Sequence, residues 1–214
     1  MHTQPDARPR TKDRILDAAE WLFAEYGLSE TSLRQITARA GVNLAAVNYH
    51  FHSKDELVLA TFARRIGPLN DIRIRALDDL ERRAGDGPLQ IEDVLRTFLE
   101  PVIASGPDTL PEQFRRLFGR MFGEPGDLFS RVIREQFDII RQRYIAAFMR
   151  ALPGVGPEEI VWKLFFMIGS MAHTLAGLHH LEAIGAGLVD TRDTNAIAER
   201  LIAFASAGFR APSR

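Results

Sequence analysis

The sequence predicts an all-α protein of about nine helices. Apolar residues recur at three- and four-residue steps along most of the chain, as in Ile15, Ala19, Leu22, Phe23 and Tyr26, and this is the spacing of one helix face. No stretch shows the alternation that is typical of a strand. Glycine and proline separate the periodic segments. With 214 residues and 46% hydrophobic content, the chain suffices for a small domain joined to a larger one.

The first quarter of the chain is predicted to hold short helices joined by tight turns. The first helix ends at Gly27, a residue typical of helix ends. The second begins at Ser32, which has capping-box spacing with Gln35. The third begins at Asn43 and the fourth at Ser53, since both residue types are favourable N-caps.

The rest of the chain is predicted to hold longer helices. Pro68 is expected to bend or interrupt the fourth helix, and Pro101 to strain or end the fifth, because proline removes one hydrogen-bond donor inside a helix. Further helices are expected from Pro111 to about residue 122, over residues 127–152, from 157 to about 183, and over 193–209. No flexible linker separates the two parts, so the fourth helix is expected to join them rigidly.

The composition argues against several classes of function. The formal net charge is −1, so no global positive field indicates a nucleic-acid partner. Cysteine is absent, which excludes disulfides, thiolate nucleophiles and cysteine-ligated zinc. The first twelve residues are polar and basic, unlike a secretory signal, and no apolar run reaches membrane-spanning length. We therefore expect a cytoplasmic protein.

One window departs from this balance of charge. Residues 31–54 contain no Asp or Glu, but they contain Arg34, Arg39 and Lys54 together with His50 and His52. A local cluster of positive charge without acids is what a phosphate-binding surface needs. The window is therefore a candidate nucleic-acid interface.

The apolar spacing within the same window predicts a helix-turn-helix. Ile36 and Ala40 on one helix would face the same core as Val47 and Phe51 on the next, with Gly41 in the tight turn between them. In this motif the second helix enters the major groove with its N-terminal residues at the base edges. The residues left outward on that helix are Asn43, Leu44, Ala45, Asn48 and Tyr49.

These outward residues suit the reading of base sequence. Small side chains would let the backbone approach the groove closely, and Leu44 and Ala45 would touch thymine methyl groups. The amide of Asn48 would pair with adenine, at about 1–3 kcal/mol of discrimination. A short buried bundle helix is the simpler alternative, but it leaves the acid-free window unexplained.

A resemblance to a known family rests on the stretch RILDAAEWLFAEYGLSETSLRQITARAGVNLAAVNYHFHSKDEL. The stretch is similar to the DNA-binding domain of TetR-family transcriptional regulators over about residues 10–65, through the motifs ILDAA, F-x-x-x-G, T-S, A-G-V, Y-x-H-F and S-K-x-x-L. The resemblance implies groove contacts from Arg34 and from the outward face of residues 43–48. It also implies phosphate contacts from Thr31, Ser32, Tyr49, His50 and Lys54.

Two positions depart from the family's pattern. Thr37 stands where the family usually has alanine, but threonine is small and its hydroxyl can bond back to a helix carbonyl. Leu44 and Ala45 stand where many members carry a glycine. The second departure concerns which DNA sequence is bound rather than the mode of binding. More narrowly, the segments VNLAAVNYHF, LFGRMFGEP and KLFFMIGSMA resemble the PsrA-like branch, which implies a response to long-chain fatty acids or their CoA esters.

Aromatic residues concentrate in the second half of the chain, where a cavity walled by them would suit a small apolar effector. The candidate ligand-binding residues are Phe98, Phe118, Met121, Phe122, Phe137, Tyr144, Trp162, Phe166 and His173. The alternative is that the aromatic residues only fill the core and that His173 is a satisfied core or interface histidine. Arg115, Arg116 and Arg120 flank one apolar stripe, where a solvated face competes with the capture of a carboxylate or phosphate.

A homodimer is expected from the last two helices. Residues 160–183 are apolar nearly all round, and such a helix is buried on both sides. Together with the last helix they would form a four-helix bundle across a two-fold axis. Paired heads would then read half-sites of a palindromic operator about 34–36 Å apart. The candidate interface residues are Gly169, Ala172, Ala176, Leu201, Phe204 and Ala205.

These observations predict a sequence-specific DNA-binding transcriptional regulator, with a helix-turn-helix domain over residues 10–65 and a ligand-binding and dimerisation domain over residues 66–214. The favoured form is a repressor released by a small apolar effector, and the resemblance suggests a fatty acid or acyl-CoA. The expected partners are a double-stranded DNA operator, the effector and a second copy of the chain, with no membrane.

Several alternatives stand beside this prediction. An architectural DNA-binding protein without ligand control would bind through phosphates alone, which the charge-poor recognition helix disfavours. An all-α enzyme is disfavoured because the chain lacks a Gly-rich phosphate loop and a G-x-S-x-G motif. No cofactor is expected, and no metal, because no third ligand has suitable spacing with His179 and His180. Repression and activation are both compatible with these residues.

Overall fold

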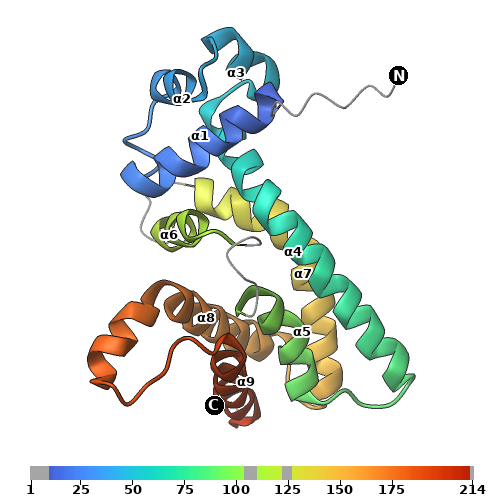
Figure 1. Ribbon diagram of the computed structural model, residues 1–214. Helices are drawn as coiled ribbons and strands as arrows, with labels where there is room; N and C mark the ends of the chain where they lie inside the picture. Colours follow the sequence, from blue (N-terminus) through green and yellow to red (C-terminus); the bar gives the residue numbers. More distant parts are fainter. Residues whose placement is uncertain (1–9, 104–109, 122–126, 213–214) are drawn as a thin grey trace, which may run out of the picture.

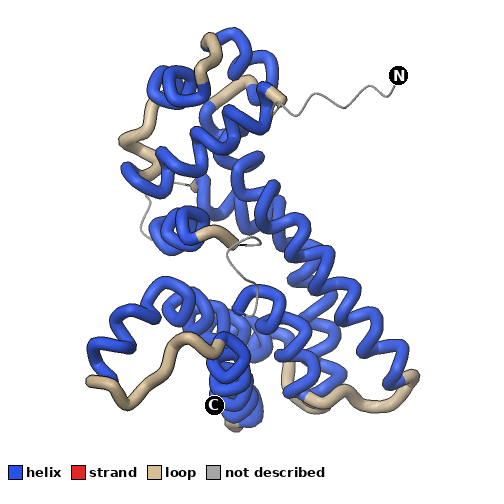
Figure 2. The backbone as a smooth tube through the Cα atoms, viewed as in Figure 1, coloured by secondary structure: helices blue, strands red, loops and turns tan. Residues whose placement is uncertain are grey.

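The computed structural model describes residues 10–103, 110–121 and 127–212, and within them it contains helices and turns but no strand (Figure 2). A head at the N-terminal end holds the three short helices α1 (Thr11–Tyr26), α2 (Leu33–Ala40) and α3 (Leu44–Phe51). The long helix α4 (Lys54–Ala84) runs from this head into the body (Figure 1). The body holds α5 (Ile91–Ile103), α6 (Glu112–Met121), α7 (Leu128–Ala151), α8 (Pro157–Gly185) and α9 (Thr194–Arg210). The predicted all-α class and its division into a head and a larger body are confirmed.

The helices of the head begin where short-range hydrogen bonds allow. Ser32 accepts a hydrogen bond from the backbone of Gln35, and the Gln35 side chain accepts one from the backbone of Ser32, so the capping box is complete. Asn43 accepts a hydrogen bond from the backbone of Ala46 at 2.9 Å. Gly41 ends α2 in the left-handed region at φ 62°. The positive φ favours glycine at this turn, and an added Cβ would come within 2.8 Å of an Arg14 terminal nitrogen, which would have to move.

Two prolines do not end their helices. α4 runs through Pro68, and α5 continues through Pro101 to Ile103. The expected interruption at Pro68 is therefore wrong. A proline removes one backbone hydrogen bond, but buried contacts on both sides of it, including Leu57 and Leu77, hold the remainder of α4 in place.

Each part of the molecule has its own packed centre. In the head, Ile15, Phe23, Ile36 and Val47 are completely buried. In the body, α5 packs against α9 and α7, and the rings of Phe148 and Phe209 stack with centroids 4.5 Å apart. None of the helices in the described ranges is long and apolar enough to cross a lipid bilayer.

Candidate nucleic-acid interface and effector cavity

The outer face of α2, α3 and the first turn of α4 gathers most of the predicted DNA-binding residues. The inward side chains Val47 and Phe51 are buried, so the opposite side of α3 faces solvent. Seven of the predicted residues are exposed and two are half-buried. The exposed ones are Ser32, Arg34, Asn43, Leu44, Ala45, Asn48 and Tyr49, and the half-buried ones are His50 and Lys54.

Thr31 lies elsewhere, although the resemblance implied a phosphate contact for it. Its side chain is only 1% exposed. Its hydroxyl donates hydrogen bonds to the carbonyl oxygens of Gly27 at 2.8 Å and Leu22 at 3.2 Å. The Thr31 hydroxyl therefore closes the end of α1 inside the head and does not reach the outer face. The other threonine, Thr37, donates back to the carbonyl of Arg34 at 2.9 Å, as its place in the helix suggested.

The turn between α2 and α3 is held by a basic residue of α1. Arg14 donates hydrogen bonds to the carbonyl oxygens of Ala40 and Gly41, which are the last acceptors of α2. Arg39 lies over the ring of Trp21 at 3.6 Å from its centroid, in a cation–π contact. These contacts fix the turn before α3. Of the other positive charges in the acid-free window, Arg34 is exposed, and the half-buried Lys54 donates a hydrogen bond to the Ser29 carbonyl oxygen at 3.4 Å.

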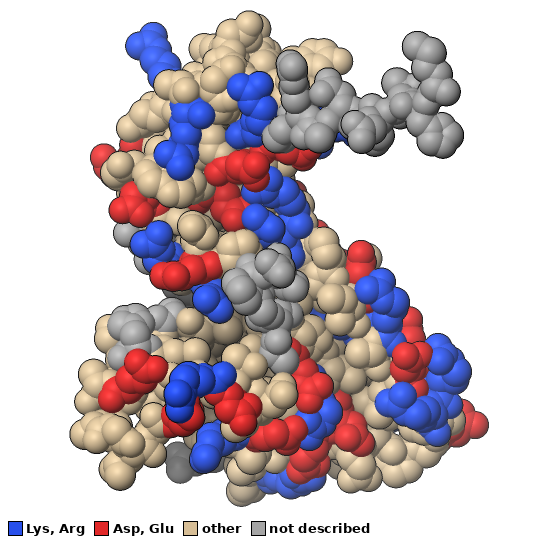
Figure 3. Space-filling view, viewed as in Figure 1, with Lys and Arg blue, Asp and Glu red and all other residues tan. Residues whose placement is uncertain are grey.

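The charge distribution on the surface agrees with the composition of the window. Residues 31–54 contain no acidic side chain. Around α2 and α3, at the upper end of the molecule in Figure 3, the charged side chains in view are Lys and Arg, and Asp and Glu come into view lower down. The tip of the head therefore presents a surface suited to phosphate groups.

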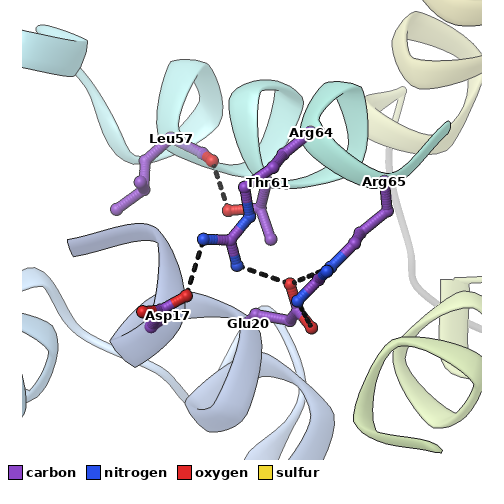
Figure 4. A network of polar contacts seen from close by, with 6 residues as sticks. All are labelled: Asp17, Glu20, Leu57, Thr61, Arg64 and Arg65. Carbon is purple, nitrogen blue, oxygen red and sulfur yellow. Dashed lines mark hydrogen bonds and ion pairs between the residues drawn. The ribbon is translucent and has the colours of Figure 1, made fainter. Parts of the chain in front are cut away.

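Ion pairs connect the head to the body through α4. Glu20 of α1 is buried and receives Arg64 at 2.6 Å and Arg65 at 2.9 Å, while Arg64 also reaches Asp17 at 2.7 Å. Figure 4 shows the two arginines descending from one turn of α4 onto α1. More exposed ion pairs also join body and head. Arg131 of α7 pairs with Asp55 and Glu56 in the first turn of α4, and Arg116 of α6 lies 3.4 Å from Glu25 of α1.

A cavity of about 550 Å³ lies in the body between α4, α5, α6, α7 and α8. Its wall is mostly aliphatic and aromatic, and its size is that of a pocket for a small molecule. Four of the predicted ligand-binding residues line it, namely Phe98, Phe118, Phe137 and Tyr144. The side chain of Met121 and the whole of Phe122 lie outside the described part of the structure.

Three other predicted ligand-binding residues do not line this cavity. Trp162, Phe166 and His173 are exposed on α8, whereas their neighbours Val161, Leu164 and Phe165 belong to the wall. Because α8 is apolar around most of its circumference, its sequence does not distinguish the side that faces the cavity.

Arg73 is a cavity residue that the sequence analysis did not identify. It is completely buried on α4 and lines the cavity. Its position continues the buried stripe of Ile66, Leu69, Leu77 and Leu80 at helical spacing. A charged residue within an apolar stripe was the signal that could have revealed it.

The predicted dimer residues fall into three groups. Gly169 and Phe204 are exposed. Leu201 and Ala205 are buried within the single chain, and Ala172 lines the cavity. The side chain of Ala176 is not among those described. On α9, therefore, Phe204 faces outward while the neighbouring predicted residues pack into the chain's own core.

Two family models match the chain. The model of bacterial regulatory proteins of the tetR family matches residues 15–61, and the model of the tetracycline repressor-like C-terminal domain matches residues 96–208. The first region holds the candidate nucleic-acid interface, and the second contributes most of the cavity wall.

Curated relatives match mainly in the head. The chain is 44% identical over 59 residues to the transcriptional regulator SrpR of Pseudomonas putida, and this match covers 28% of each chain. It is 39% identical over 110 residues to the regulator AcrR of Shigella flexneri, which covers 50% of this chain and 45% of AcrR. The matches span less than half the length of either relative.

Solved structures are similar over nearly the whole chain. The fatty acid degradation regulator FadR of Bacillus halodurans matches with a TM-score of 0.62 and 13% identity, covering 97% of this chain and all of FadR. NalD of Pseudomonas aeruginosa matches with a TM-score of 0.58 and 24% identity, covering 93% and 95%. At these identities the likeness shows the fold. Because the C-terminal family model alone spans more than half of the sequence, the chain belongs to the tetR family of bacterial regulatory proteins.

Proposed function

We propose that this protein is a homodimeric, sequence-specific DNA-binding repressor whose release from DNA is controlled by a small apolar effector. The observation that carries the proposal is the exposed, acid-free face of α2 and α3. In this assignment residues 10–65 form the DNA-binding domain, and residues 66–214 form the domain for effector binding and dimerisation.

The proposed DNA contacts divide into two kinds. Asn43, Leu44, Ala45 and Asn48, with Arg34, would meet base edges in the major groove. The side-chain oxygen of Asn43 already caps α3, so the N–H groups of its side-chain amide are the part left to contact DNA. Phosphate contacts would come from Ser32, Tyr49, His50 and Lys54. Thr31 is omitted because its hydroxyl is engaged inside the head.

An apolar surface on α8 and α9 supports a homodimer. Trp162, Phe165 and Phe166 are exposed on α8 and contact one another, with ring centroids about 6 Å apart. Phe204 is exposed on α9, and Gly169 is exposed one turn beyond Phe165. Large exposed apolar patches favour association. We propose that a second copy covers Trp162, Phe166 and Phe204, which do not line the cavity, and that the glycine allows close approach of two helices.

The route from effector to DNA follows three helices. On α4, Ile66 lines the cavity directly after Arg64 and Arg65, which bind Glu20 of α1. On α6, Arg115 lines the cavity beside Arg116, which contacts α1. α7 repeats the arrangement, because its Ile133 lines the cavity close to the contact of α7 with the first turn of α4. A ligand that shifts these helices would therefore shift the head.

Such a ligand changes DNA affinity only if it favours one conformer over the other. In the proposed mechanism the bound effector stabilises a conformer in which the two heads of the dimer no longer match successive turns of the groove. DNA affinity then falls by the ratio of the effector's affinities for the two conformers.

The effector class is proposed from the cavity and from the relatives. A fatty acid or acyl-CoA is the first class to test, because the wall is apolar and the similar structure FadR is a fatty acid degradation regulator. Another similar structure holds SmeT with triclosan, so a wider set of apolar molecules also belongs in the first screen.

A fluorescence-anisotropy titration over a series of salt concentrations tests the DNA-binding part. DNA flanking the gene and a scrambled control are compared, with Asn48→Ala as the variant and Arg82→Ala, on the exposed far end of α4, as its matched control. We expect much tighter binding to the flanking DNA, and a log–log salt slope of about −0.9 per neutralised phosphate on both DNAs.

Equal binding to both DNAs with equal salt dependence would contradict the proposal for these sites and favour an architectural binder. Adding the effector candidates to the same samples tests release. Size-exclusion chromatography with light scattering tests the dimer.

A further inference from the structure

The buried charges of this chain are treated unequally. Three charged side chains are buried in the described ranges, namely Glu20, Arg73 and Lys163. Glu20 is paired with two arginines. Lys163 lies 3.0 Å from Glu159 and also donates to the carbonyl oxygens of Gly208 and Ala211. Arg73 alone has no acidic partner among the described residues.

The partners of Arg73 leave much of its guanidinium unsatisfied. Nε donates to the carbonyl oxygen of Phe98 at 3.0 Å, and Nη1 donates to the side-chain oxygen of Asn70 at 3.2 Å. Nη2 reaches only the thioether sulfur of Met171, at 4.0 Å. A guanidinium has five N–H donors, so only two of the five meet an oxygen within the described part of the chain.

Burial of this charge is unfavourable in the free protein. An ionised group taken out of water without an opposite charge loses hydration that hydrogen bonds replace only in part. Burial lowers the pKa of Arg73 to about 10, and the side chain stays protonated at neutral pH. The ring of Phe98, whose centroid lies 4.0 Å from the guanidinium carbon, offers further but weak compensation.

The charged residues around the cavity favour an anion. Besides Arg73, the wall includes Arg115, Arg134, Arg141 and a single acid, Asp138. Asp138 is already engaged by Arg141 and by Gln142. A molecule entering the cavity therefore meets exposed arginines first and a buried arginine inside, with apolar side chains filling the remaining wall.

A purely structural role does not account for these contacts. The hydrogen bond of Arg73 to Phe98 joins α4 to α5, and the one to Asn70 lies within α4, but a neutral amide side chain would make similar bonds without burying a charge. A guanidinium is well matched to a carboxylate, because it presents two parallel N–H groups to the two oxygens. A carboxylate bound at Nη1 and Nη2 would supply the missing opposite charge.

We propose that the effector is a free monocarboxylic acid with an apolar body, and that Arg73 binds its carboxylate inside the cavity. The inference rests on the proposed effector control and narrows its ligand class. A carboxylic ester or a CoA thioester has no charge at the acyl end to pair with Arg73. The site therefore selects the free acid over its neutral derivatives.

Binding to the full-length protein without DNA tests this proposal. Isothermal titration calorimetry compares decanoate and para-butylbenzoate with their methyl esters, so that one acid is linear and the other aromatic. In the wild-type protein we expect at least one acid to bind, and to bind about tenfold or more tightly than its ester. This comparison needs no variant and so cannot fail through misfolding.

Two variants assign the effect to Arg73. In Arg73→Met the preference for the acid should disappear while the ester still binds. Arg134→Met, which changes an exposed arginine of the same wall, should keep most of the preference. Thermal unfolding by circular dichroism verifies that both variants fold.

The proposal is overturned if no acid binds the wild-type protein, if acid and ester bind equally, or if the preference survives in folded Arg73→Met. Anisotropy with DNA is measured separately. A protein that binds its DNA but no acid overturns this inference alone. A protein that binds the acid without any effect on DNA overturns the proposed release instead.

Discussion

The head and the body differ in how they treat a buried charge. In the head, Glu20 is enclosed between two arginines, and Arg14 ties the end of α2 to α1. In the body, Arg73 is enclosed beside a cavity of about 550 Å³ without an acidic partner in the described residues. The head thus pairs its buried charge with opposite charges, while the body encloses a charge that has no acidic partner among the described residues. The contrast separates groups that hold the molecule together from a group that we propose binds the carboxylate of the effector.

The largest expected effect comes from removing the paired charge of the head. Glu20→Ala leaves Arg64 and Arg65 without their shared carboxylate. We expect a loss of about 3 kcal/mol in the free energy of unfolding, at the lower end for buried pairs because both arginines keep about a quarter of their side chains exposed.

Urea unfolding measures the change. The matched control is Glu25→Ala, which removes an exposed acid of the same helix 3.4 Å from Arg116 and should cost no more than about 1 kcal/mol. Equal losses in the two variants would mean that the enclosed pair does not stabilise the head.

Changing the outer face should leave the head intact and alter its partner. Asn48→Ala is expected to weaken binding to the specific DNA by about 1–3 kcal/mol, because the amide would no longer pair with a base. Binding to scrambled DNA and the thermal midpoint should change little, since Asn48 is exposed. Anisotropy on both DNAs measures the difference, and an equal loss on both would place Asn48 among the phosphate contacts.

The two buried cations of the body, Lys163 and Arg73, differ in whether they have an acidic partner among the described residues. Lys163→Met leaves Glu159 and two backbone carbonyl oxygens without their donor, and we expect a loss of about 1–3 kcal/mol in unfolding free energy. Arg73→Met removes a buried charge that has no acidic partner, but it also leaves the Phe98 carbonyl oxygen and the Asn70 side-chain oxygen without this donor, so the free protein should lose less stability than with Lys163→Met. Thermal and urea unfolding of both variants decide the matter. Similar losses would show that Arg73 is stabilised as well as Lys163.

The smallest expected effect concerns a surface pair between α5 and α9. Two hydrogen bonds from Arg210 lower the pKa of Glu92 from 4.5 to about 2. A carboxyl group with a lowered folded-state pKa stabilises the fold above its unfolded pKa, and this contribution is lost as the pH falls from about 4.5 to about 2.

Because both side chains are partly exposed, the contribution should stay below about 1 kcal/mol. Urea unfolding of the wild type and of Glu92→Gln at several pH values measures it. The two curves should converge at low pH, and parallel curves would contradict the assignment.

The local signals of the head were read correctly from the sequence. Ser32 and Asn43 cap their helices because the hydrogen bonds involved span only three residues. Ile36, Val47 and Phe51 are buried as their spacing indicated. The position of Thr31 was not predicted, because its hydroxyl donates to carbonyl oxygens at the end of α1, across the turn that precedes α2.

The body was harder to interpret from its sequence. α8 is apolar on several sides, so its periodicity did not tell that Leu164 and Phe165 line the cavity while Trp162 and Phe166 point away. Pro68 indicated a bend or an interruption by a local rule, and the helix nevertheless continues through it because both sides of it are packed. The sequence alone did not distinguish Arg73 from the other arginines, because its burial depends on the packing of other helices around α4.

By itself, the sequence determined the all-α class, the ends of the short helices and the acid-free window of residues 31–54. These features depend on neighbouring residues, through hydrogen bonds a few positions apart and through local charge. Only the tertiary structure decided which side of α8 meets the cavity and that Arg73 is buried there without an acid among its described neighbours. Burial depends on helices that are distant in the chain, and the free energy of an ionised group depends on what those helices bring around it.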